Sequence, residues 1–206
     1  MRFFRSVFSY DMQNSWIQYY QNTKNRPPSL LLVRALNYVE KKDAALDLGS
    51  GALNESLYLV DRGYGKVVAI DKEQIPEEFL NKITNNQFQF IHSTFDQFDF
   101  IEKNFNLINA NFSLPFNPPS TFSEVWNRMA NSLVFGGIFV GQFFGVHDEW
   151  NKPERNMSFH TTDQIKEFLS NFEIIEFNEV EKDGTLADGS HKHWHVFHVI
   201  AKKKKP

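Results

Sequence analysis

Two glycines and two aspartates form the pattern in this sequence that best fits ligand chemistry. Asp47 precedes Gly49 and Gly51 in the run LDLGSGALN, and Asp71 follows Gly51 by 20 residues. Glycines let the backbone turn sharply and approach a ligand closely, and a helix that starts there presents free N–H groups. A carboxylate at the end of the next strand can accept hydrogen bonds from both hydroxyls of a ribose. The spacing therefore predicts a site for an adenosine-containing ligand, with Ser50 at its turn.

Alternating helices and strands must position this turn. Ser29 can cap a helix whose apolar residues recur on one face, and Leu53, Leu57 and Val60 should face inward in the helix after the glycines. Strands that alternate with helices indicate a parallel sheet. For the first half of the chain we predict helices over 29–42, 54–61 and 75–83 and strands over 44–48, 66–71 and 87–91.

The second half continues this alternation and then breaks it. Thr161 and Gln164 resemble a capping box that opens a helix. The last two strands are separated only by the polar loop 182–192, which is short for a helical crossover and should make them antiparallel. We predict strands over 105–110, 137–144, 173–181 and 194–201 and helices over 121–133 and 161–169.

Composition limits the possible classes of protein. A chain of 206 residues with 41% apolar residues can close one sizeable core, so we expect a domain over 29–206 with an N-terminal cap or lid over 1–28. The net charge is −3 and the basic cluster 202–205 is short, so no nucleic-acid partner is expected. The absence of cysteine excludes disulfides and cysteine nucleophiles. Residues 1–10 are not continuously apolar, so we expect no membrane association and a cytoplasmic location.

The glycine–aspartate spacing fits both dinucleotides and S-adenosylmethionine. Two features favour S-adenosylmethionine: Asp47 before the glycines, with Asn54 where a third glycine would be, and the C-terminal antiparallel hairpin. A sulfonium ligand has no pyrophosphate that needs the helix dipole. Two alternatives stay open, namely a nicotinamide-dependent oxidoreductase and an S-adenosylmethionine-binding module without turnover.

From residue 16 to residue 203 the chain resembles class I S-adenosylmethionine-dependent methyltransferases. The segments that carry the resemblance are 45–51 (ALDLGSG), 68–71 (VAID), 90–95 (FIHSTF) and 133–137 (LVFGG). Thr94 stands where an aspartate is common, and Phe135 replaces the usual proline. More narrowly, 16–20 and 27–29 resemble small bacterial methyltransferases of the tellurite-resistance type.

The resemblance implies a Rossmann-like, doubly wound α/β fold. Its seven strands would have the order 3-2-1-4-5-7-6, with the last strand antiparallel. It also implies that Gly49, Ser50 and Gly51 cradle the methionine part of the cofactor, with Asp47 at its amino group and Asp71 at the ribose. The remaining implied cofactor residues are Asn54, Thr94, Phe95, Asn111 and Phe112.

A small-molecule acceptor is expected. The sequence leaves open which molecule it is, and it also leaves open the oligomeric state of the protein. The segment 109–116 is not an Asn-Pro-Pro-aromatic motif, so a base-amine acceptor loses support. His193 is the candidate catalytic residue, because a histidine at the ligand-binding edge can take a proton near neutrality. The candidate residues on the substrate side are Trp16, Tyr20, Arg26 and His191.

Metal binding is not expected, although the last strand carries a histidine cluster. Four histidines occur between 191 and 198. Alternation along a strand puts His193 and His195 on one face and His198 on the other. No carboxylate or cysteine lies near them in sequence to complete a metal site, and His195 and His198 are expected to be structural.

Overall fold

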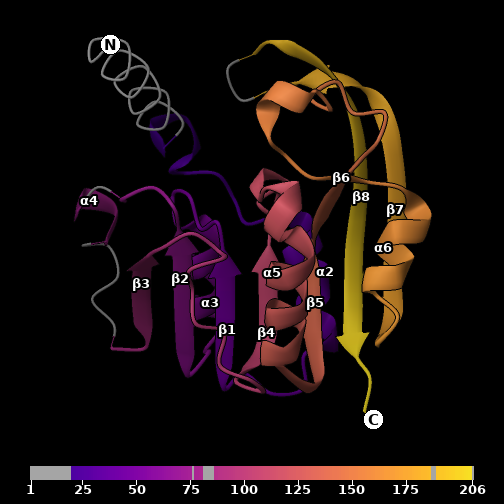
Figure 1. Ribbon diagram of the computed structural model, residues 1–206. Coiled ribbons are helices and arrows are strands. Elements are labelled where there is room, and N and C mark those ends of the chain that lie inside the picture. Colours follow the sequence, from indigo (N-terminus) through magenta and orange to yellow (C-terminus); the bar gives the residue numbers. More distant parts are fainter. Residues whose placement is uncertain (1–19, 76, 81–85, 187–188, 206) are drawn as a thin grey trace.

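A single mixed β-sheet forms the centre of the molecule (Figure 1). The computed structural model describes residues 20–75, 77–80, 86–186 and 189–205. The sheet order is β3-β2-β1-β4-β5-β8-β7, and the two-residue β6 pairs with β5 off this path. The strands are β1 Ala44–Leu48, β2 Lys66–Asp71, β3 Phe88–His92, β4 Phe105–Ala110, β5 Leu133–Gly145, β6 Phe159–His160, β7 Phe172–Thr185 and β8 His191–Lys203.

This order confirms the predicted fold class. The first five strands are parallel, and β8 runs antiparallel to both β5 and β7. With the short β6 left out of the numbering, the order is the expected 3-2-1-4-5-7-6. The carboxyl ends of the parallel strands therefore meet at one edge of the sheet, where open α/β sheets bind their ligands.

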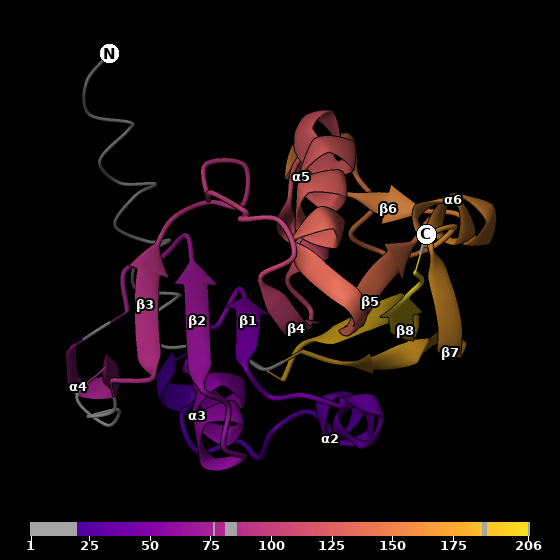
Figure 2. The ribbon, with the colours of Figure 1, turned by 90° about the horizontal axis from the view of Figure 1, so that it is seen from below.

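Helices cover both faces of the sheet (Figure 2). α2 (Leu30–Ala35) and α3 (Asn54–Asp61) lie on one face, and α5 (Pro119–Ser132) and α6 (Thr162–Phe168) lie on the other. The short α4 (Glu77–Leu80) lies beside β3 at the sheet edge. No helix in the described ranges is both long enough and apolar enough to span a membrane.

Each face of the sheet carries its own hydrophobic core. Leu46 of β1 packs in the cluster that contains Trp126 of α5, whereas its neighbour Ala45 packs in the cluster that contains Leu32 of α2. All five residues of β1 are buried. A strand with both faces covered is buried in this way in parallel sheets, so β1 rigidly positions the turn that follows it.

Two helices differ from their predicted form. The helix predicted over 29–42 ends at Ala35, where a 3-10 turn over Leu36–Tyr38 leads the chain back towards β1. In α3 the fully buried apolar residue is Leu59, while Leu57 and Val60 are only half-buried. Of the helix predicted over 75–83, residues 81–83 lie outside the described residues.

The capping box and the C-terminal hairpin form as predicted, and the hairpin is longer. Thr161 Oγ1 accepts from Gln164 N, and Gln164 Oε1 accepts from Thr161 N. β8 pairs with β5 only from Val196 to Lys202, so the hairpin continues beyond the end of β5. The extended part of the hairpin needs other contacts to hold it against the sheet.

A buried ion pair supplies one such contact. Lys192 Nζ donates to Asp148 Oδ2 at 2.6 Å, and both side chains are almost fully buried. The ammonium lies 3.7 Å from the ring centroid of Trp194 and 4.6 Å from that of Trp150. Asp148 also accepts from the backbone N–H of His195. The loop after β5 is thereby fastened to the hairpin.

Removing one partner of this pair should destabilise the fold strongly. Asp148→Ala leaves the Lys192 ammonium buried and unpaired, so we expect a loss of about 3–5 kcal/mol in the free energy of unfolding. Denaturant titration measures it. Glu154→Ala, an exposed acid in the same loop, should change stability by less than about 0.5 kcal/mol. Equal stability of the two variants would refute this role for Asp148.

Candidate functional site

The turn after β1 requires glycine. Gly49 and Gly51 have φ of +71° and +48°, in the left-handed region that favours glycine. A Cβ at Gly49 would overlap the Cβ of Ser113. The backbone N–H groups of Gly49 and Ser50 both donate to Ile70 O, at 2.8 and 3.0 Å, so the turn is fastened to β2.

The next position with glycine-like geometry is 53, not 54. Leu53 has φ of +65°, which is costly for a residue with a branched side chain. Asn54 instead opens α3, and its Nδ2 donates to Thr23 O at 2.8 Å. The positive φ of Leu53 is not visible in the residue types, because leucine rarely adopts that conformation.

Asp71 is held beside the glycine turn. Its Oδ2 accepts from Gly51 N and its Oδ1 from Glu73 N, both at 2.9 Å. Burial raises the pKa of Asp71, and the two backbone hydrogen bonds oppose that rise. Each carboxylate oxygen retains a second lone pair. The Asp71 carboxylate can therefore still accept hydrogen bonds from ribose hydroxyls, and this contact remains a prediction.

Most of the expected cofactor residues line one small cavity. Its open volume is about 20 Å³, which is room for about one water molecule. Arg26 and Thr23 of the N-terminal segment form part of its wall, so a larger ligand requires that segment to move. The lining residues are Thr23, Arg26, Asp47, Gly49, Ser50, Gly51, Ala52, Asn54, Glu55 and Asn111.

Asp47 is a buried carboxylate at the base of this cavity. Its two oxygens accept from Ser56 Oγ at 2.6 Å and from Asn109 Nδ2 at 2.8 Å. Burial, with the nearby Glu55 charge, raises the pKa of Asp47 to about 7. The side chain thus joins β1 to α3 and β4 and also faces the site.

Glu55 is a site residue that the sequence analysis missed. Its Oε1 accepts from Asn111 Nδ2 at 3.0 Å, from Ser29 N at 3.2 Å and from Arg26 Nη2 at 3.3 Å, and the residue is 5% exposed. A signal was available, since an acid in the first turn of a helix after a glycine turn interacts favourably with the helix dipole. Glu55 and Arg26 together place opposite charges at one end of the cavity.

Hydroxyl groups without partners surround the glycine turn. Among the described residues, Ser50 Oγ, Thr94 Oγ1 and Ser113 Oγ are buried and make no hydrogen bond. The Phe95 ring reaches to 3.7 Å from the position of a Cβ on Gly49. A buried polar group without a partner costs about 1–3 kcal/mol. These groups therefore fit a polar ligand with an apolar ring, as the adenosine prediction requires.

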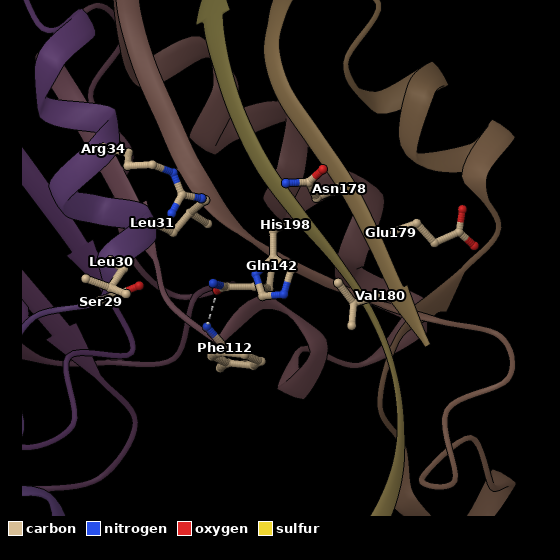
Figure 3. A pocket seen from close by; sticks show the side chains of 10 residues that line it. All are labelled: Ser29, Leu30, Leu31, Arg34, Phe112, Gln142, Asn178, Glu179, Val180 and His198. Atoms are coloured by element: carbon tan, nitrogen blue, oxygen red, sulfur yellow. Dashed lines mark hydrogen bonds between the residues drawn. The ribbon is translucent and has the colours of Figure 1, made fainter. Parts of the chain in front are cut away.

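A larger cavity of about 430 Å³ lies between α2 and strands β5, β7 and β8 (Figure 3). Phe112 stands at its wall with φ of +53°, and its N–H donates to Gln142 Oε1 at 2.8 Å. Asn111, the preceding residue, lines the small cavity. Two consecutive residues, Asn111 and Phe112, therefore line one cavity each. The lining residues are Ser29, Leu30, Leu31, Arg34, Phe112, Gln142, Asn178, Glu179, Val180 and His198.

The histidine at the larger cavity is His198, not His193. The His198 ring packs edge-on against Phe112, with centroids 6.1 Å apart, and makes no hydrogen bond within the described chain. His193 lies on the other face of β8, where its nitrogens face Asp183 at 2.8 Å and Glu181 at 3.3 Å. Alternation along β8 therefore turns His193 away from Phe112, and a catalytic role for His193 stays a prediction.

The other substrate-side candidates are dispersed. Tyr20 is buried against Ala52 and Leu53, and Arg26 lines the small cavity. His191 is exposed at the start of β8. Trp16 lies outside the described residues. Of the three that the structure describes, Arg26 is the one that lines a cavity.

Comparison with known proteins agrees with this geometry. A family model described as tellurite resistance protein TehB matches residues 9–192. A search of curated proteins found no match. TehB from Haemophilus influenzae has a similar structure, with a TM-score of 0.69 and 21% identity over 84% of this chain and 61% of that one. This chain thus spans less than two thirds of that relative.

Two further solved structures share the fold. A 1,6-didemethyltoxoflavin-N1-methyltransferase from Burkholderia thailandensis has a TM-score of 0.66 and 16% identity over 97% of this chain and 90% of that one. The N-methyltransferase NodS from Bradyrhizobium japonicum WM9 has a TM-score of 0.62 and 14% identity over 84% and 86%. The family match covers most of the sequence, so the chain belongs to the tellurite resistance protein TehB family and has the fold of class I S-adenosylmethionine-dependent methyltransferases.

Proposed function

We propose that this protein transfers a methyl group from S-adenosylmethionine to a small, uncharged molecule bound in the cavity beside Phe112. The observation that carries the proposal is that consecutive residues, Asn111 and Phe112, line the smaller and the larger cavity. The solved structures of the Burkholderia enzyme and of NodS both contain S-adenosylhomocysteine, and the former also contains bound 1,6-didemethyltoxoflavin. The antiparallel β8 counts against a nicotinamide-dependent oxidoreductase.

The smaller cavity offers complementary groups for each part of the cofactor. The amino-acid end of S-adenosylmethionine is a zwitterion, and the Arg26–Glu55 pair presents one charge of each sign. Asp71 presents both carboxylate oxygens for the ribose hydroxyls, and Thr94 with Phe95 would contact the adenine. Gly49, Ser50, Gly51 and Asn54, which line this cavity, would surround the methionine part.

The larger cavity favours an uncharged acceptor. Arg34 in its wall is neutralised by Glu176 at 3.0 Å. Figure 3 shows the Glu179 carboxylate pointing away from the cavity. Its Oε1 lies 2.9 Å from His195 Nε2. Amide groups and apolar side chains make up most of the remaining wall. A volume of about 430 Å³ suits a small ligand.

His198 is placed to accept the acceptor's proton. Burial, with the nearby Arg34 charge, lowers the pKa of His198, so the ring is neutral at pH 7 and can act as a base. When bound, S-adenosylmethionine supplies an electrophilic methyl group for direct displacement. The wall around Phe112 would align the acceptor's lone pair and exclude water, which can contribute several kcal/mol.

The segment before α2 is proposed to act as a lid. Thr23 and Arg26 are fastened to the site by Asn54 and Glu55, at 2.8 and 3.3 Å. Both are polar contacts at the wall of the small cavity, where contacts with a bound cofactor could replace them. Opening of residues 20–28 would admit the cofactor, and closure would bring Arg26 onto it.

Asp71→Ala should weaken binding of S-adenosylhomocysteine by about 1.5–3 kcal/mol, the range for losing a charged hydrogen-bond partner. Isothermal titration calorimetry measures this change. Asp61→Ala at the exposed end of α3 serves as the control and should bind normally. Tight NADH binding without S-adenosylhomocysteine binding would overturn the assignment.

Glu55→Gln should distinguish the amino-acid end from the nucleoside end. We expect affinity for S-adenosylhomocysteine to fall by about tenfold, since a charged hydrogen bond contributes about 1.5–3 kcal/mol. Affinity for 5′-methylthioadenosine, which lacks the amino-acid part, should change by less than about threefold. Equal losses for the two ligands would remove Glu55 from recognition of the amino group.

His198→Asn should lower methyl transfer by about 10²-fold or more, the scale for a lost proton acceptor, and leave cofactor affinity unchanged. Acceptors are first found by incubating uncharged and anionic small molecules with methyl-labelled S-adenosylmethionine. His193→Asn is the control and should retain activity. If only the anionic molecules are methylated, the proposed class of acceptor is contradicted.

The pH dependence follows from the lowered pKa of His198. The neutral ring is the active form, so turnover should stay constant down to pH values below the ordinary histidine pKa of about 6.5 and then fall as the ring is protonated. The acid limb should disappear in His198→Asn. An unchanged limb in that variant would assign it to another group.

A further inference from the structure

Three polar side chains form a row across the sheet at one wall of the larger cavity. In the strand register Gln142 of β5 pairs with His198 of β8, and His198 pairs with Asn178 of β7. Residues paired across neighbouring strands share one face of the sheet, and all three line the cavity. Figure 3 shows them following one another from β5 to β7, with Phe112 beside Gln142. We call this row the polar strip.

Apolar side chains of β5 and β8 border the polar strip on both sides. Two residues away along the strands, the same face carries Val140 paired with Ile200 in one direction and Phe144 paired with Val196 in the other. All four are buried. In these two strands the polar groups that face the cavity are thus confined to one line. A few placed polar groups within an apolar wall are typical of a site that fixes the orientation of a ligand.

Gln142 presents an unused hydrogen-bond donor to this cavity. Its Oε1 accepts from Phe112 N at 2.8 Å. Because a backbone N–H can only donate, this bond fixes the orientation of the carboxamide and leaves its Nε2 group over. Nε2 makes no hydrogen bond to any residue that the structure describes, and Gln142 is 1% exposed. A buried donor without a partner is costly, so an acceptor atom of a ligand at Nε2 would remove that cost.

His198 and Asn178 extend the polar strip towards solvent. Neither makes a hydrogen bond within the described part of the chain. The neutral His198 ring has one donor and one acceptor nitrogen, and the Asn178 carboxamide also offers both. Gln142 is buried, His198 half-buried and Asn178 exposed, so the strip leads from the inner end of the cavity to its mouth. Neighbouring strands lie about 4.7–4.9 Å apart, so the strip is about 10 Å long.

Phe112 supplies an aromatic surface at the inner end of the polar strip. Its ring is 36% exposed, although Trp194 and His198 pack edge-on against it with centroids 6.1 Å away. Its φ of +53° is a strained backbone conformation, which persists only where neighbouring contacts hold it. The hydrogen bond to Gln142 is such a contact. An aromatic ligand can pack against the open part of the ring in an offset or edge-to-face arrangement.

We propose that the acceptor is a flat, uncharged heterocycle of two fused rings whose polar edge lies along the polar strip. A carbonyl oxygen would accept from Gln142 Nε2, a ring N–H would donate to His198, and a ring nitrogen would accept from Asn178. The edge of one six-membered ring is shorter than the strip. This acceptor class rests on the proposed function, and it makes Gln142 and Asn178 the residues that determine specificity.

Binding of two uncharged bicyclic probes tests the proposal. Quinazolin-4-one carries a carbonyl group, an N–H and a second ring nitrogen along one edge, whereas quinoline has the same two fused rings with one ring nitrogen. Isothermal titration calorimetry is done with S-adenosylhomocysteine bound. Quinazolin-4-one should bind about tenfold more tightly, because quinoline leaves two members of the polar strip without partners. Equal affinities, or no saturable binding of quinazolin-4-one, would overturn the proposal.

Two substitutions test the polar strip itself. Gln142→Glu keeps an oxygen for Phe112 N but removes the Nε2 donor, and Asn178→Leu removes an exposed carboxamide. Each should weaken binding of quinazolin-4-one by about fivefold or more, the scale of one lost hydrogen bond, and should weaken binding of quinoline much less. Asn127→Leu makes the same change at an exposed position of α5, on the other face of the sheet, and should bind both probes normally.

The two variants also separate this acceptor class from the proposed function. An unchanged preference for quinazolin-4-one in both variants, or an equal loss in Asn127→Leu, would refute the role of the polar strip. Because Asn178 is exposed, Asn178→Leu keeps the test decisive if Gln142→Glu fails to fold. Absence of the preference while S-adenosylhomocysteine still binds overturns the acceptor class alone, whereas absence of S-adenosylhomocysteine binding by the unaltered protein contradicts the proposed function.

Discussion

The buried carboxylate of Glu55 connects residues that line the two cavities. One of its oxygens accepts hydrogen bonds from the Arg26 side chain, the Ser29 backbone N–H and the Asn111 side chain. A carboxylate removed from water is costly unless it is hydrogen-bonded, so these three donors offset its burial. They come from the N-terminal segment, the start of α2 and the end of β4. The walls of both cavities therefore depend on one side chain at the start of α3.

Local patterns allowed most of the sheet to be predicted. β4 has its predicted bounds, Phe105–Ala110, because a short buried run is visible in residue types alone. The glycine turn and Asp71 were likewise found from spacing. The chain conformation at Leu53 and the early end of α2 were not, since both depend on how the turn and the following segment pack against β1 and β2.

The sequence alone did not allow us to predict which residues meet through strand pairing. Glu181 opposes His195 only because the hairpin has one register, and that register is not written in any motif. The same limit applies to the histidines of β8. Both faces of β8 carry histidines, and which face meets Phe112 is decided by the pairing of β8 with β5. A slip of one residue would exchange His193 and His198 between faces.

The position of β8 between β5 and β7 also bears on how the chain is made. β5 ends at Gly145, but the strand that covers its free edge is completed only at Lys203. During translation at about 5–20 residues per second, that edge is without β8 for several seconds. An uncovered strand edge is a template for pairing with another chain. The nascent protein therefore passes through an interval in which chaperones at the ribosome have an edge to shield.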